Sequence, residues 1–268
     1  MTGEWQHFGC RHDDGVTTVT FTRPEQLNAL TFDVYADLRD LLHELPQRGD
    51  TRALVLRGAG RAFCSGGDVH EIIGELLAMR DRPDRLLEFT RMTGEVVKAL
   101  REVPIPVIAA VHGVAAGASA VLALAADFRV VARSARFAFL FTRVGLAGAD
   151  MGSAYLLPRL VGLGVATRLL MTGDPIGADE AHSIGLASDL VDDDALDEAS
   201  TALARRLAGG PSFAYATTKA LLTRELDMPL SGALELEAIT QALLMNGADF
   251  AEFHASFTQK RPPNWQGR

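Results

Sequence analysis

The chain has 268 residues, of which 48% are hydrophobic and 22% charged, and its formal net charge is −8. This composition is typical of a globular protein with a sizeable core. The acidic balance argues against a nucleic-acid partner, which would require a basic face. No apolar run reaches the roughly 18 residues that a membrane span needs, and the seven His and two Cys show no metal-ligand spacing.

The cysteines and the first residues indicate a reducing compartment. Only Cys10 and Cys64 are present, so no disulfide framework is implied. The opening stretch MTGEWQHFGCRHDDG lacks the basic and then apolar pattern of a signal peptide. We therefore expect a cytoplasmic protein without a metal site.

Strand-like and helix-like segments alternate over the first two thirds of the chain. Strands are predicted for β-rich or continuous apolar runs at 16–23, 52–58, 104–113, 128–132 and 136–139. Helices are predicted at 32–45 behind an N-cap at Thr31, at 74–103 with an interruption near Pro83, and at 117–127. HDDG, ahead of the first of these strands, is typical of a hairpin turn.

A Gly-rich loop running into a helix follows at 144–162, and from about residue 164 the pattern is helical to the end. Alternation followed by helices alone predicts an α/β core with a helical C-terminal part. We place the division between residues 1–195 and 196–268.

Two Gly-rich segments, CSGGD (64–68) and HGVAAGAS (112–119), each follow a buried strand. Ligands of open α/β sheets lie at the carboxyl ends of strands, and a helix N-terminus offers free N–H groups. Two such loops side by side could aim two N–H donors at one enolate or tetrahedral oxyanion. The alternative is that these glycines only permit tight turns. The strand-GxG stretch LVLRGAGRAF has Phe63 where a nicotinamide site needs a third Gly, so no such site is expected.

Six segments in order resemble the crotonase (enoyl-CoA hydratase/isomerase) superfamily. They are RPEQLNALT (23–31), RAFCSGGDV (61–69), PVIAAVHGVAAGAS (106–119), the loop 144–162, GDPIGADEAHSIGL (173–186) and FTQKRPPNW (257–265). The resemblance implies a spiral of ββα turns and a C-terminal helical trimerisation region, in a homotrimer or a dimer of trimers. It also implies an acyl-coenzyme A thioester substrate and no separate cofactor, since coenzyme A is part of the substrate.

The resemblance also assigns residues to the oxyanion and coenzyme A sites. Gly67 matches the first oxyanion donor and Ala118 the second. The residues expected to contact coenzyme A are Arg23, Ala62, Phe63, Ser65, Gly66, Asp68, Val69, Gly117 and Lys260. Arg23, Lys260 and the adjacent Arg261 would pair with its phosphates; for the last two, the alternative is a solvated tail.

The catalytic carboxylates of the family's hydratases are absent from their expected positions. The matching residues are Val121 and Phe141, which cannot transfer a proton. Asp150 lies in VGLAGADMGSAYLLP, which resembles the loop of the family's dienoyl-CoA isomerases and aroyl-CoA dehalogenases. It could act as an acid/base or as a nucleophile. The alternative is that Asp150 caps the following helix through Ser153.

Three further residues are candidates for a second acid/base: His70, Glu71 and Glu75. The segment 76–92 is expected to supply an apolar wall of the acyl pocket. The sequence thus predicts an enoyl-CoA hydratase/isomerase family enzyme with lyase or isomerase chemistry and Asp150 as its leading acid/base. Two alternatives stay open: a hydrolase or ring-modifying enzyme on an aroyl- or alicyclic-CoA, and a catalytically lapsed acyl-CoA-binding protein.

Overall fold

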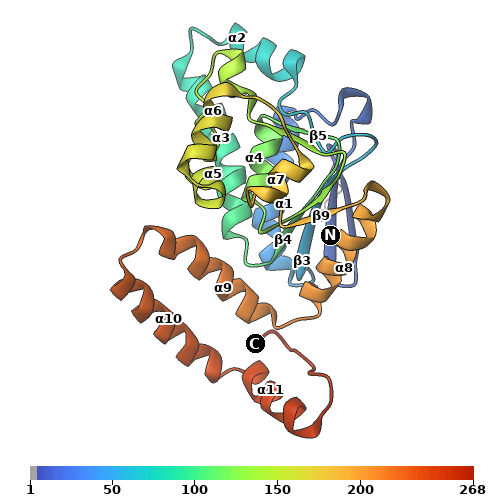
Figure 1. Ribbon diagram of the computed structural model, residues 1–268, viewed down its shortest axis with the longest axis vertical. Helices are drawn as coiled ribbons and strands as arrows, with labels where there is room; N and C mark the ends of the chain where they lie inside the picture. Colours follow the sequence, from blue (N-terminus) through green and yellow to red (C-terminus); the bar gives the residue numbers. More distant parts are fainter. Residues whose placement is uncertain (1–4) are drawn as a thin grey trace.

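The computed structural model describes residues 5–268, and a mixed β-sheet lies at its centre (Figure 1). Six strands form this main sheet in the order β1-β2-β3-β4-β6-β9. The first pair is antiparallel and the later pairs are parallel. The bounds are Gly9–Asp13 for β1, Val16–Phe21 for β2, Ala53–Gly58 for β3, Val107–Val111 for β4, Phe128–Ala132 for β6 and Asp189–Val191 for β9.

A second, three-stranded sheet has the order β5-β7-β8, with bounds Val114–Ala116, Arg136–Ala138 and Ile176–Gly177. Two isolated bridges extend it, one between Leu30 and Gly67 and one between Cys64 and Ala115. The chain therefore repeats one path: a strand of the main sheet, a short extended segment at the second sheet, and then a helix. These stacked turns are the ββα spiral that the resemblance implies.

Helices cover both faces of the main sheet. α1 (Phe32–Arg48), α3 (Pro83–Glu102) and α4 (Ala118–Ala125) share one apolar core with the side chains of Leu54 and Leu56 on β3. The intervening Val55 faces the other side, where α8 (Leu196–Ala208) covers the sheet. The remaining α-helices are α2 (Gly74–Ala78), α5 (Ser153–Val161), α6 (Leu163–Thr172), α7 (Ala178–Ser183), α9 (Ser212–Arg224), α10 (Leu230–Met245) and α11 (Ala248–Gln259).

Helices α9, α10 and α11 extend from the body as an arm (Figure 1). Their apolar side chains are widely exposed, for example Leu230 at 74% and Phe257 at 75%. α10 has no buried residue at all. Within residues 5–268, none of the helices is long and apolar enough to cross a lipid bilayer.

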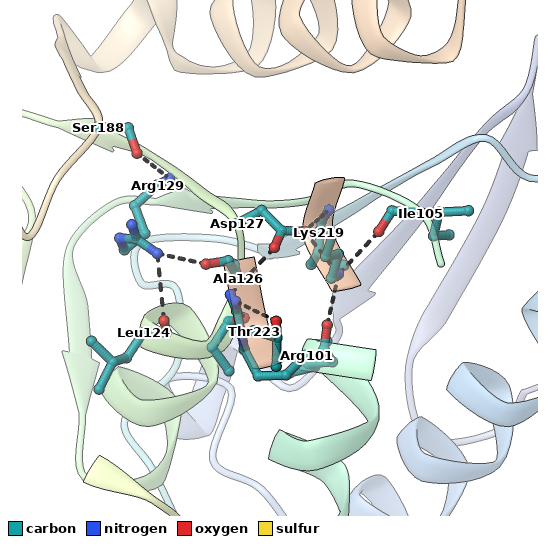
Figure 2. Close-up of polar contacts among 12 residues, drawn as sticks. Arg101, Ile105, Leu124, Ala126, Asp127, Arg129, Ser188, Lys219 and Thr223 are labelled. Atoms are coloured by element: carbon teal, nitrogen blue, oxygen red, sulfur yellow. Dashed lines mark hydrogen bonds and ion pairs between the residues drawn. The ribbon is translucent and has the colours of Figure 1, made fainter. Parts of the chain in front are cut away.

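A buried polar cluster joins the arm to the body (Figure 2). Lys219 of α9 donates to the carbonyl oxygens of Leu100 (2.8 Å) and Ile105 (3.0 Å) and pairs with Asp127 at 2.8 Å. Arg101 of α3 also contacts Asp127, at 3.3 Å, and its guanidinium donates to Thr223 Oγ1 on α9 at 2.9 Å. α9 is thereby held against the C-terminal end of α3.

The predicted strands and helices of the first two thirds are found within a few residues of their expected bounds, and Thr31 accepts the Val34 N–H as the N-cap of α1. The expectation that helices alone follow residue 164 is wrong, because β8 and β9 lie there. Both strands are too short to produce a visible alternation. The division at residue 195 stays a prediction; α8, just after it, packs on the sheet, α9 is held against α3, and α10 and α11 extend away from the body.

Candidate active site

Two Gly-rich loops meet where Cys64 and Ala115 form an isolated parallel bridge. The Ala116 N–H donates to the Cys64 carbonyl at 3.1 Å, which fixes how the two segments are aligned. Three residues beyond the bridged pair, one loop reaches Gly67 and the other reaches Ala118. The register of the second sheet therefore brings the two predicted oxyanion donors to neighbouring positions.

Close contact between the loops explains the glycine at position 66. Gly66 has a φ of +96°, and a Cβ there would lie 2.6 Å from the Ala116 carbonyl oxygen and 3.6 Å from the Ala118 nitrogen. Ser119 fastens the same junction, because its Oγ lies 2.5 Å from the Cys64 carbonyl oxygen and 2.9 Å from the Ala116 nitrogen. The two donors are thus held on a rigid support.

Both donor N–H groups are free to bind a ligand. The bridge to Leu30 uses the carbonyl of Gly66 and the N–H of Asp68, each at 2.8 Å, so the N–H of Gly67 points away from Leu30. Ala118 is the first residue of α4, where N–H groups have no partner inside the helix. Among residues 5–268, no acceptor is bonded to either N–H.

Both donors lie in the wall of a cavity of about 200 Å³. This volume is below the ~300–1,000 Å³ usual for ligand pockets, so the cavity suits a short or compact group. Of the predicted coenzyme A contacts, Ser65, Gly66, Val69 and Gly117 also line it. The other lining residues are Tyr35, Ile72, Ile73, Leu76, Phe89, Thr93, Leu140, Phe141, Val144, Leu146, Asp150 and Met151.

Asp150 supplies the one carboxylate among the described residues that line the cavity. Its Oδ1 accepts the Met151 N–H at 2.9 Å, and no other hydrogen bond within residues 5–268 reaches the carboxylate. Burial raises the pKa of Asp150, and the bond from Met151 opposes that rise in part. The alternative role as a helix cap is not found, because Gly152 is the N-cap of α5 and Ser153 Oγ instead accepts the N–H of Asp150.

Asp68 and Arg23, both predicted to contact coenzyme A, bind each other. Asp68 accepts the N–H groups of His70 (2.9 Å) and Glu71 (3.1 Å) and pairs with Arg23 at 3.0 Å. The bond from the Glu71 N–H, helped by His70 and Arg23, lowers the pKa of Asp68 against the effect of burial. This network holds the loop directly after Gly67, while a role of Arg23 toward phosphates stays a prediction.

The three candidates for a second acid/base lie outside the cavity wall. His70, Glu71 and Glu75 are exposed, and the Glu71 carboxylate is paired with Arg23 at 2.9 Å. None of these three is among the lining residues. The structure therefore does not bring them together with Asp150. Among the residues that the structure describes, no group of three or more His, Cys, Asp or Glu is placed to hold a metal ion.

The remaining predicted contacts also lie away from the cavity. Ala62 and Phe63 are buried behind the loop, and their carbonyl oxygens accept from the Asn28 side chain at 2.8 and 3.3 Å. Lys260 ends α11, at the opposite end of the molecule from α2 (Figure 1). Lys260 is not among the residues that line the cavity, and its contact with coenzyme A stays a prediction.

Tyr35 and Met151 are two of the cavity residues that the sequence did not single out as functional. Tyr35 belongs to the apolar stripe of α1, and its helical spacing predicted only core packing. Met151, directly after Asp150, has a φ of +51°, which is unusual for a residue other than Gly and is not visible in the sequence. A phenol inside an otherwise apolar stripe is the one signal that could have marked Tyr35.

The spiral of ββα turns is the architecture of the crotonase fold. The family model for enoyl-CoA hydratase/isomerase matches residues 11–268, so the chain belongs to that family and is an enzyme of it. A crystal structure from Streptomyces coelicolor A3(2), whose name assigns it to the enoyl-CoA hydratases, superposes with a TM-score of 0.97 at 68% identity and covers 100% of this chain and 97% of its own.

Curated relatives extend over the same length. A Rhodobacter capsulatus protein named as a probable enoyl-CoA hydratase is 41% identical over 259 residues, 95% of this chain and 96% of the relative. The 1,2-epoxyphenylacetyl-CoA isomerase of Escherichia coli is 36% identical over 256 residues, 96% of this chain and 97% of the relative. Names of both hydratases and isomerases therefore occur among full-length relatives.

Proposed function

We propose that this enzyme isomerises an unsaturated acyl-CoA thioester by moving one proton between two carbons of the acyl group. The observation that carries the proposal is the lone carboxylate of Asp150 in a cavity that also presents the N–H groups of Gly67 and Ala118. An isomerisation needs one group that takes a proton and returns it. A hydration needs a second group to position and activate water.

The proposed reaction begins at the thioester carbonyl. Its oxygen accepts hydrogen bonds from Gly67 and Ala118, which stabilise the negative charge of an enolate. Asp150 removes a proton from the acyl chain, the double bond shifts, and Asp150 returns the proton to another carbon. No atom is gained or lost. Burial favours this role, because it raises the pKa of Asp150 and makes its carboxylate a stronger base.

The apolar residues at the two hydratase positions also favour isomerisation over hydration. Phe141 lines the cavity and Val121 is fully buried, so neither can hold or deprotonate a water molecule. The Escherichia coli relative is named as an isomerase, which is consistent with proton-shift chemistry. Coenzyme A is in this proposal a part of the substrate, and no further cofactor is invoked.

A second candidate is attack by Asp150 on a halogen-bearing ring carbon of an aroyl-CoA, in which the halide leaves as the aryl ester to Asp150 forms. The observation that favours it is the pair of aromatic side chains, Phe89 and Phe141, in the same wall as Asp150. The Asp150 carboxylate has one oxygen without a hydrogen bond from residues 5–268, as a nucleophile needs. Hydrolysis of the resulting ester would transfer an Asp150 oxygen to the product.

The experiment offers enoyl-, dienoyl- and aroyl-CoA thioesters in D₂O enriched in ¹⁸O and follows products by mass. Isomerisation yields an isomer of the substrate without ¹⁸O, which carries a deuterium only where the proton on Asp150 exchanges with solvent before its return, whereas the aroyl reaction introduces oxygen. Asp150→Asn should lower turnover at least about a hundredfold. Asp192→Asn, which changes an exposed carboxylate outside the cavity, should not. Fast hydration of crotonyl-CoA by the wild type, or full activity of Asp150→Asn, would refute the proposal.

We also propose that the arm assembles a homotrimer or a dimer of trimers. Large apolar side chains rarely stay exposed in such number on a monomer. Those of α10 and α11 that are more than half exposed are Leu230, Leu234, Ile239, Leu243, Met245, Phe250, Phe253 and Phe257. A neighbouring subunit would cover them, and the arm would then bring Lys260 close to the coenzyme A site of another copy. The cytoplasmic location stays a prediction.

A further inference from the structure

Tyr35 places a phenol inside the acyl cavity. It lies one turn into α1, is 2% exposed, and its ring packs edge-on against Phe89 at a centroid distance of 6.2 Å. Both rings line the cavity together with Asp150. Most of the wall around them is aliphatic, so the Tyr35 hydroxyl is a polar group in apolar surroundings.

The Tyr35 hydroxyl has no hydrogen-bond partner among residues 5–268. Buried phenols normally have one, because an unpaired buried hydroxyl costs about 1–3 kcal/mol. The oxygen is also not among the fully enclosed side-chain atoms that lack a partner. The small part of Tyr35 that stays accessible therefore includes this oxygen, and the cavity is where it is accessible. The hydroxyl is aimed at the space that a ligand would fill.

The phenol is a hydrogen-bond donor at every physiological pH. Burial raises the pKa of Tyr35 well above its ordinary value, and the nearby Cys64 and Asp150 raise it further. No neighbouring polar group among residues 5–268 accepts a hydrogen bond from the Tyr35 hydroxyl. Thr93, the other hydroxyl deep in this wall, donates to the Thr90 carbonyl of its own helix at 3.1 Å. What the Tyr35 O–H lacks is an acceptor.

We propose that Tyr35 determines substrate specificity by donating a hydrogen bond to an oxygen atom of the acyl group. This inference rests on the proposed function and narrows its substrate class. Preferred acyl-CoA thioesters carry a hydroxyl, carbonyl or ether oxygen on the acyl chain, beyond the thioester carbonyl. A hydrocarbon chain leaves the Tyr35 hydroxyl unpaired and binds less well for that reason.

The test measures binding of unreactive ligands by calorimetry. Hexanoyl-CoA is compared with three ether analogues in which oxygen replaces the methylene at C3, C4 or C5 of the acyl chain. These ligands have nearly the same shape, so differences in affinity report the environment of the oxygen. The variant Tyr35→Phe removes the hydroxyl and keeps the ring. Tyr215→Phe, at a tyrosine outside the cavity that packs beside α8, is the matched control.

We expect one ether analogue to bind about five- to tenfold more weakly to Tyr35→Phe than to the wild type, the loss of one hydrogen bond. Hexanoyl-CoA should bind equally or more tightly to this variant, and Tyr215→Phe should match the wild type throughout. In the wild type alone, the analogue whose oxygen meets Tyr35 should bind better than the other two, which bury an unpaired oxygen. This second comparison does not depend on the folding of a variant.

Two results would overturn the inference. One is an equal change for all four ligands on Tyr35→Phe, which would make the hydroxyl structural. The other is the same affinity for the three analogues in the wild type. Failure of the proposed function looks different, because it appears as fast hydration of crotonyl-CoA or as full activity of Asp150→Asn, and neither result changes these binding comparisons.

Discussion

The polar cluster beneath the arm predicts an asymmetric response to mutation. Asp127→Ala removes the carboxylate that faces Lys219 at 2.8 Å and Arg101 at 3.3 Å, and it leaves the two cations facing each other (Figure 2). It also removes the acceptor of the Val107 N–H at 2.8 Å. Lys219 is only 7% exposed, so water cannot replace the lost partner. Breaking a buried pair in this way costs about 3–5 kcal/mol of the free energy of unfolding.

Lys219→Met should cost less, about 2 kcal/mol. The carbonyl oxygens of Leu100 and Ile105 lose a donor, but Asp127 keeps Arg101 and the Val107 N–H. The double variant Asp127→Leu/Lys219→Met removes the Lys219 charge together with its partner and leaves Arg101, whose side chain is 20% exposed, with its hydrogen bond to Thr223; it should be more stable than Asp127→Ala alone. Lys98→Met, which changes a lysine whose side chain is 58% exposed, should lie within about 0.5 kcal/mol of the wild type.

The assay is urea denaturation followed by circular dichroism at one fixed protein concentration, because assembly of copies would otherwise shift the midpoint. A pH series adds a further check. Burial lowers the pKa of Lys219, and loss of Asp127 should lower it more. Because the pKa of Lys219 is lower in the folded protein than in the unfolded chain, keeping the lysine protonated costs stability at low pH. This cost disappears as pH rises and the folded lysine loses its proton. The deficit of Asp127→Ala should therefore shrink as pH rises toward 10.5, the ordinary pKa of a lysine. A larger loss for Lys219→Met, or a deficit that grows with pH, would refute this account.

Three other perturbations test the loops, the base and the arm. Gly66→Ala should abolish turnover and lower the melting temperature, because the added Cβ would lie 2.6 Å from the Ala116 carbonyl oxygen at a residue with a φ of +96°. Gly67→Ala should fold normally, because its Cβ would have no contact closer than 3.7 Å. Calorimetric melting distinguishes the two variants. The value of kcat/KM should fall at acid pH with a pKa above 3.8, the ordinary value of an Asp, because the ionised Asp150 is the active base and burial raises its pKa. A fall with the ordinary pKa would contradict this effect of burial. Phe257→Asp should reduce the oligomer measured by light scattering, because its 75% exposed ring belongs to the proposed interface; an unchanged mass would remove Phe257 from that interface.

Gly67 and Ala118 were assigned from the resemblance of two sequence segments to the crotonase family, and the bridge at Cys64 lies three residues before each of them. The apolar residues at the hydratase positions were identified from the same resemblance. The role of these residues stays a prediction. The short strands β8 and β9 were not predicted, because each forms by pairing with a strand distant in the sequence and has almost no local sequence pattern.

One physical reason explains why the sequence did not predict some cavity residues as functional. The cavity wall is assembled from α1, the loop after β3, the start of α4, and the segments around Phe141 and Asp150, so its polar content is a property of tertiary distance. Tyr35 lies at the helical spacing of a core residue and is buried, like Leu38 one turn later. It differs from Leu38 in having a hydroxyl that lacks a hydrogen-bond acceptor among the described residues. Asp68 shows the converse, since a residue expected to contact the ligand has its carboxylate bonded within the chain. In a site of this kind, the hydrogen bonds that a buried polar group does or does not make inside the protein decide whether it is left to act on a substrate.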